Sequence, residues 1–263
     1  MSCSGRCLFG KDSGNRVGCR RSAHHSRHRE QRRAEVSGAV ARVRRISPEV
    51  DAFLSGEQRI RIERHEPPGA GPHPALLLAH GSGGAVSYWL NRFAPQLTAF
   101  GVGVHAPHYF DKTGTARATA EMILDGQHFP AWLRALEDAV ADLRARPSVD
   151  ARRIGVLGIS LGGYLVVALG IGDPTLRLVI ELSGGIPPGW EVRVTAAMAP
   201  TLVLHGAEDT IVPVSEAHKL QRILTGCGAR CQTEIFPREN HWFSPQAVPK
   251  LLMTCGAFLA RYL

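Results

Sequence analysis

The five residues 158–162, Gly-Ile-Ser-Leu-Gly, constrain the fold of this chain more than any other segment. Residues 153–159 form an apolar run that predicts a buried strand, and residues 163–169 predict a buried helix. A serine at a sharp strand-to-helix turn, with glycine two residues before and after it, is typical of a nucleophile elbow. We therefore expect the Ser160 hydroxyl to point outward, with the Leu161 N–H facing the same space. The alternative is a glycine-rich connection with an incidental serine.

The rest of the chain after residue 45 alternates strand-like and helix-like segments, which predicts an α/β fold with a mostly parallel, doubly wound sheet covered by helices on both faces. Only seventeen residues, 184–200, separate the two strands after the elbow, so we expect no lid domain and an open pocket shaped by short loops. Residues 107–129 are expected to form a long connection. The predicted strands are 58–63 (at an edge), 75–79 (central), 102–106, 153–159, 177–182, 201–205 and 232–236, and the predicted helices are 88–100, 130–146, 163–169, 215–224 and 248–262.

A nucleophilic serine needs a histidine base, which is oriented in turn by a carboxylate. In this architecture the chain order is serine, acid, histidine, each on a loop after a strand. Asp209 follows the strand 201–205 and His241 follows the strand 232–236, so both should lie at the carboxyl edge of the sheet. Glu208 is the alternative acid, because spacing alone does not separate it from Asp209.

The loop 80–84, His-Gly-Ser-Gly-Gly, directly follows the central strand. Such a loop can lend a backbone N–H to an oxyanion hole. We expect the Ser82 N–H, or alternatively that of Gly83, to converge with the Leu161 N–H. A phosphate-binding loop is disfavoured, because neither G-x-G-x-x-G nor a Walker lysine is present.

Several residues on loops at the same edge of the sheet are candidates for the walls of a substrate pocket. Aromatic side chains pack in cores as often as they line pockets, so both interpretations stay open for the aromatic ones. His105 and His205 end strands and are expected to be structural. The candidate pocket residues are Gly83, Tyr109, Phe110, Trp190 and Trp242.

With these motifs in place, residues 55–263 resemble the α/β-hydrolase superfamily and, within it, dienelactone hydrolase-like proteins. The motifs that carry the resemblance are 80–84, 107–111, 158–163, 205–213 and 240–243. The resemblance implies a lidless, mostly cytoplasmic hydrolase of esters or lactones that needs no cofactor. We also expect no metal at the site. Dienelactone hydrolases proper use a cysteine nucleophile, whereas this chain has Ser160, which favours general carboxylesterase activity.

The expected function is therefore hydrolysis of a small-molecule ester or lactone through Ser160, His241 and Asp209 and an acyl-enzyme. Acyl transfer, thioester hydrolysis and peptide hydrolysis could run on the same triad. A binding protein that keeps the fold without catalysis is the non-enzymatic alternative. The sequence leaves acyl specificity and oligomeric state open.

The formal charge of +8 is concentrated in residues 1–45, which hold twelve Lys/Arg and three Asp/Glu. The remaining 218 residues hold 19 basic and 20 acidic side chains, so no nucleic-acid partner is expected for the predicted domain 46–263. Residues 1–45 are expected to be a disordered basic tail. Its possible roles are a polyanion-binding arm or a transit peptide, and the alternatives are a solvated extension or sequence upstream of the native start.

The six cysteines are expected to be free thiols, because no secretory signal follows Met1. The spacing of Cys3, Cys7 and Cys19 matches no zinc-finger pattern, so no metal site is expected in the tail. No segment approaches membrane-spanning length, so no membrane partner is expected either.

Overall fold

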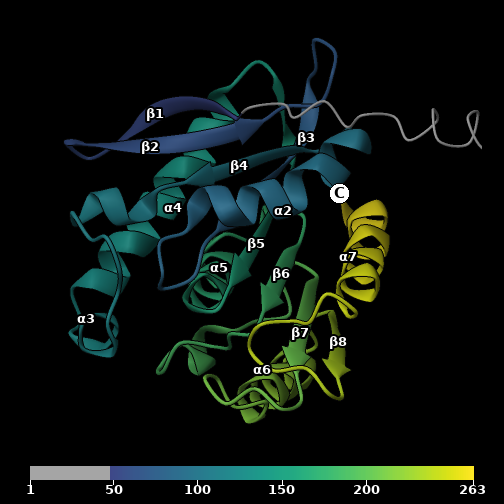
Figure 1. Ribbon diagram of the computed structural model, residues 1–263. Coiled ribbons are helices and arrows are strands. Elements are labelled where there is room, and N and C mark those ends of the chain that lie inside the picture. The colour runs from purple at the N-terminus through teal and green to yellow at the C-terminus, as the bar shows by residue number, and fades with distance from the viewer. Residues whose placement is uncertain (1–47) are drawn as a thin grey trace, which may run out of the picture. The chain divides into compact units, whose positions relative to one another are not determined.

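A sheet of eight strands organises the part of the chain that the computed structural model describes, residues 48–263 (Figure 1). Its spatial order is β1-β2-β4-β3-β5-β6-β7-β8. From β4 to β8 neighbouring strands are parallel, while β2 pairs antiparallel with both β1 and β4. The strands are β1 Glu49–Ser55, β2 Gln58–His65, β3 His73–Ala79, β4 Gly103–Pro107, β5 Val149–Ile159, β6 Val179–Leu182, β7 Thr201–Gly206 and β8 Cys231–Phe236.

Helices cover both faces of this sheet, as predicted (Figure 1). Successive side chains of a strand point to opposite faces, so Leu77 of β3 packs on the side of α4, α5 and α6, and Leu76 packs on the side of α2 and α7. Strands buried on both faces explain the continuous apolar runs in the sequence. The helices are α2 Val86–Ala99, α3 Ala120–Leu124, α4 His128–Ala145, α5 Leu161–Gly172, α6 Ser215–Gly226 and α7 Val248–Tyr262, with short 3₁₀ helices η1 Tyr109–Lys112 and η2 Glu191–Arg193.

Strand β2 does not lie at the edge of the sheet, and this prediction was wrong. Strand β1 precedes it and pairs with it from Glu49 opposite Arg64 to Ser55 opposite Gln58. Phe53 is the only large apolar side chain of β1 that is buried, so the strand has little of the alternation that marks a half-buried strand.

The connections at the carboxyl edge of the sheet differ in how much regular secondary structure they contain. The expected long connection 107–129 contains η1 and α3 rather than loop alone. Between β6 and β7 the only regular element is η2, so no lid domain is inserted there, as predicted. No helix within residues 48–263 is both long enough and apolar enough to cross a membrane.

The predictions for residues 1–45, including Cys3, Cys7 and Cys19, lie outside the described residues. The described cysteines, Cys227, Cys231 and Cys255, are free thiols.

Candidate active site

Ser160 occupies a strained turn between β5 and α5. Its φ of 57° and ψ of −118° lie in a region that side-chain-bearing residues rarely adopt. A Cβ at Gly158 would lie 2.0 Å from the Gly162 carbonyl oxygen, and a Cβ at Gly162 would lie 2.3 Å from the Ala79 carbonyl oxygen. Both positions therefore require glycine, and the two glycines of the motif allow strand and helix to approach this closely.

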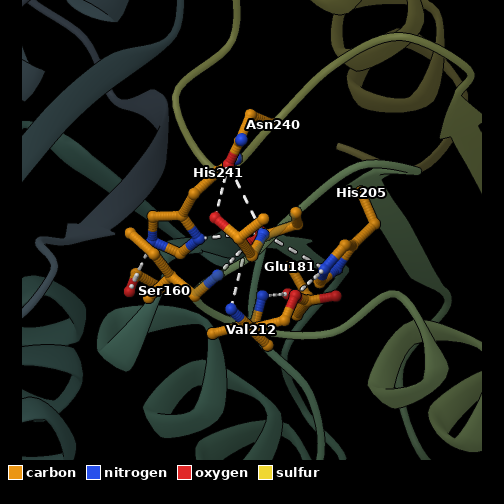
Figure 2. Close-up of polar contacts among 10 residues, drawn as sticks. Ser160, Glu181, His205, Val212, Asn240 and His241 are labelled. Carbon is orange, nitrogen blue, oxygen red and sulfur yellow. Dashed lines mark hydrogen bonds and ion pairs between the residues drawn. The ribbon is translucent and has the colours of Figure 1, made fainter.

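His241 contacts Ser160, as Figure 2 shows, and it also contacts Asp209. Its Nδ1 lies 2.8 Å from Asp209 Oδ2, and its Nε2 lies 3.0 Å from Ser160 Oγ. Because a carboxylate only accepts hydrogen bonds, Nδ1 carries the proton, which leaves the Nε2 lone pair to accept the Ser160 hydroxyl. The structure thus brings together the three side chains that the sequence singled out, in one continuous hydrogen-bonded chain.

The Asp209 carboxylate is buried and held by backbone groups. Its Oδ1 accepts hydrogen bonds from the N–H groups of Ile211 and Val212, each at 2.9 Å. Its other oxygen, which bonds His241, also lies 3.4 Å from His205 Nε2. These contacts fix the orientation of the carboxylate, so it presents the same oxygen to His241.

Glu208 is exposed, so Asp209 and not Glu208 is the acidic side chain that contacts His241. The loops that carry Asp209 and His241 also approach one another closely. A Cβ at Gly206 would lie 2.3 Å from the Glu239 carbonyl oxygen, so this approach again requires glycine. Asn240 then accepts the His241 backbone N–H through Oδ1 at 2.6 Å.

His205 is buried beside the Asp209 carboxylate. Its Nε2–H donates to the Val212 carbonyl oxygen at 2.9 Å, and burial lowers the pKa of the imidazole. A neutral His205 therefore supports the loop 206–212 without adding a charge. The expectation of a structural role left out its contact with Asp209, which only the folded loop creates.

The loop 80–84 lies directly against Ser160. A Cβ at Gly81 would lie 3.3 Å from the Ser160 Cβ. Leu161 is the first residue of α5, so its N–H has no acceptor within the helix. The loop 80–84 and the first turn of α5 therefore both lie next to Ser160.

The ring of Tyr109 supports this loop from beneath. The Tyr109 hydroxyl donates to the His80 carbonyl oxygen at 2.7 Å, and the two rings stack with centroids 4.1 Å apart. Burial lowers the pKa of His80 to about 4, so its imidazole is neutral and bonds the Gly81 carbonyl oxygen through Nδ1. The Ser82 carbonyl oxygen accepts the Ala118 N–H at 2.9 Å, which joins the loop to the segment before α3.

The five candidate pocket residues have different surroundings. Tyr109 and Phe110 are buried in the core, so the structure places them beneath the loop 80–84 rather than at a pocket wall. Trp190 lines a cleft of about 730 Å³ that also contacts Leu161. Trp242 is 61% exposed, and its ring lies beside the His241 ring and stacks on Trp89. A Cβ at Gly83 would meet no atom within 4 Å, so this residue borders open space.

Glu181 is a residue that the sequence analysis did not single out. It is fully buried in β6, and its Oε1 accepts the Gly184 N–H. Burial raises the pKa of Glu181 to about 8, the Gly184 N–H opposes the rise, and the charge of Asp209 adds to it. The signal was available, because Glu181 is the one charged residue in the apolar strand 179–182.

The model of the dienelactone hydrolase family matches residues 63–250, which include Ser160, Asp209 and His241. The chain belongs to the dienelactone hydrolase family. Its α/β-hydrolase fold also resembles a solved dienelactone hydrolase-like promiscuous phosphotriesterase from metagenomic libraries, with a TM-score of 0.72, 18% identity, and coverage of 82% of this chain and 98% of the other. At that identity the likeness concerns the fold alone.

Two curated relatives of this family member bear different names. A protein of Oryza sativa subsp. japonica named "probable inactive carboxylesterase" is 29% identical over 53% of this chain and 58% of its own length. The mitochondrial acyl-coenzyme A thioesterase 2 of Mus musculus is 28% identical over 65% of this chain and 32% of its own length. The chain thus spans less than two thirds of the length of either relative. Among residues 48–263 no cluster of His, Cys, Asp or Glu could hold a metal ion.

Proposed function

We propose that this protein is a serine hydrolase that cleaves carboxylic esters through an acyl-enzyme on Ser160. The observation that carries the proposal is the chain of hydrogen bonds Ser160–His241–Asp209, at 3.0 and 2.8 Å, on a strand-to-helix turn. A serine nucleophile needs a base within hydrogen-bond reach and an acid that orients the base. Membership of a hydrolase family supports the same reaction class.

In the first half of the reaction, His241 Nε2 takes the Ser160 hydroxyl proton as Oγ attacks the ester carbonyl carbon. The N–H groups of Leu161 and Ser82 stabilise the oxyanion that develops on the carbonyl oxygen. When the carbon–oxygen bond to the alcohol breaks, His241 returns the proton to the leaving oxygen. Asp209 keeps the proton of the imidazole on Nδ1 and stabilises the charged ring.

In the second half a water molecule attacks the acyl-enzyme. His241 takes a proton from the water, the tetrahedral intermediate collapses, and the proton passes to Ser160 Oγ as the acid leaves. The reaction consumes one ester and one water and produces one acid and one alcohol. It requires no cofactor, because every proton is carried by His241.

Two measurements on the purified protein test this proposal. A fluorophosphonate probe should label the wild-type protein at Ser160, and p-nitrophenyl esters from acetate to octanoate should be turned over. The variant Ser160→Ala should lose labelling and lower kcat by about 10⁶-fold, since the three side chains act as one unit. As a matched control, Ser215→Ala at the exposed start of α6 should leave both unchanged.

A folded wild-type protein that the probe does not label would overturn the proposal in favour of a binding role. This outcome must be tested because the name of the rice relative includes the word inactive. The mouse thioesterase supports thioesters as a second substrate class, because a thiol can leave from the same intermediate. Matched octanoyl esters and thioesters would rank the two classes by kcat/KM.

A further inference from the structure

A cleft of about 730 Å³ lies next to the proposed nucleophile, although Ser160 itself does not line it. Leu161, the residue after Ser160, forms part of its wall, and so does Ile211, whose N–H holds Asp209. Its other walls are α3 with the residues that follow it, the loop 186–190, and the first turns of α6. An ester whose carbonyl carbon lies at Ser160 Oγ can therefore extend one of its substituents into this cleft.

The walls of the cleft are mostly apolar. Ile123, Phe129, Ile186 and Trp190 supply large side chains from the two connecting segments. The volume falls within the range of about 300–1,000 Å³ that small-molecule sites occupy. An acetyl group would leave most of this volume unfilled, whereas a longer acyl chain would bury apolar surface along it.

The charges on the walls disfavour an anion. Lys219 is the only cation among the lining residues, and its Nζ already bonds Glu191 Oε1 at 2.7 Å. Glu216 lies on the wall against Gly185, where a Cβ would be 3.2 Å from Glu216 Oε2. Within residues 48–263 no hydrogen bond reaches the Glu216 carboxylate. A second carboxylate entering the cleft would lose its hydration and meet the Glu216 carboxylate, whose charge Lys219 compensates only in part because its Nζ bonds Glu191.

We propose that the cleft holds the acyl group, that the protein selects esters of uncharged apolar acids of medium chain length, and that Glu216 excludes anionic acyl groups. This rests on the proposed ester hydrolysis at Ser160. The cleft lies on the side of Leu161, while the leaving oxygen must approach His241, which donates its proton. The acyl and alcohol parts of the substrate thus take different sides of the site.

The test compares kcat/KM for matched p-nitrophenyl esters, after fluorophosphonate titration has counted the functional sites. From acetate to octanoate, kcat/KM should rise about three- to fourfold per methylene until the cleft is filled. The octanoate ester should exceed the mono-p-nitrophenyl ester of the eight-carbon diacid by at least 100-fold. In Glu216→Gln this second ratio should fall at least tenfold, because the opposing charge is gone.

Glu121→Gln is the matched control, since Glu121 is an exposed carboxylate on α3 that does not line the cleft. It should change the ratio less than twofold. A second variant, Ile123→Trp, fills the cleft and should lower the octanoate-to-acetate ratio at least tenfold. Each kcat/KM is calculated per functional site counted by the titration, so these ratios do not depend on the fraction of a variant that folds.

The outcomes separate the two proposals. If Ser160 is labelled but kcat/KM is flat with chain length, or the diacid ester reacts as well as octanoate, the cleft does not select the acyl group. An unchanged ratio in Glu216→Gln would remove Glu216 from selectivity. If the probe does not label Ser160, the proposed hydrolysis itself fails.

Discussion

Glu181 makes the stability of this protein depend on pH in a way that one substitution can isolate. Its side chain is fully buried, and Oε2 has no hydrogen-bond partner among residues 48–263. Removal of a carboxylate from water disfavours its charged form, which raises the pKa from 4.5 to about 8. At neutral pH we therefore expect a protonated Glu181 in the folded protein and an ionised one in the unfolded chain.

The direction of this pH dependence follows from the number of protons that the folded and unfolded states bind. Below pH 4.5 both states hold the proton, and this group contributes no pH dependence. Between pH 4.5 and 8 the unfolded chain releases the proton while the folded protein keeps it, so the free energy of unfolding falls by about 1.4 kcal/mol per pH unit. Over this interval the loss is on the order of 5 kcal/mol, and above pH 8 it grows no further.

Glu181→Gln keeps the size of the side chain and an oxygen that can accept the Gly184 N–H, but it cannot ionise. Urea unfolding of both proteins at pH 5, 6.5 and 8 gives the difference in their free energies of unfolding, in which all other titrating groups cancel. We expect this difference to shift in favour of the variant by several kcal/mol from pH 5 to pH 8. A difference that stays constant within about 1 kcal/mol would show that Glu181 is ionised when folded and would refute the argument.

Two further substitutions test the geometry of the site. In Asp209→Asn the amide oxygen should stay with the two backbone N–H groups, so the amide NH₂ faces His241 and forces the ring proton onto Nε2. The value of kcat on p-nitrophenyl esters should then fall about 10³- to 10⁴-fold, and a loss below tenfold would contradict this. Gly158→Ala places a Cβ 2.0 Å from the Gly162 carbonyl oxygen and should lower the free energy of unfolding by about 3 kcal/mol or more, measured by urea unfolding. The control Gly172→Ala, where a Cβ meets no atom within 4 Å, should change it by no more than about 1 kcal/mol, and equal effects at both glycines would refute the close approach.

Chain order and buried apolar runs were enough to predict the central sheet and to single out Ser160, Asp209 and His241. Each of the three lies in the turn or loop after a predicted strand, and the carboxyl ends of parallel strands meet at one edge. The choice between Glu208 and Asp209 could not come from spacing, because both residues lie on the same loop. It depends on the turn in which Oδ1 of Asp209 binds two backbone N–H groups, and that turn forms only in the folded loop.

The remaining differences between the predictions and the structure arise where tertiary packing decides whether a residue faces the core or the solvent. Tyr109 and Phe110 follow β4 on a connection whose direction no local pattern fixes, and they pack inward beneath His80. Only Phe53 and Ser55 of strand β1 are buried, so its sequence lacks the apolar repeat that marks a core strand. The cleft wall formed by α3 could not be predicted, because a helix of five residues is shorter than any periodicity signal.

Ser160 and Ser183 are the two residues other than glycine with positive φ within residues 48–263, and both directly follow paired strands. Ile159 of β5 lies opposite Leu182 of β6, so the two strained turns are neighbours at one edge of the sheet. The Ser160 N–H donates to the Leu182 carbonyl oxygen at 2.9 Å, and the Ser183 N–H donates to that of Leu204 at 2.9 Å. These bonds continue the sheet ladders through the turns, so the sheet holds the strained conformation even before substrate arrives. The Ser160 hydroxyl thereby keeps its position against His241 without relying on the mobility of a loop.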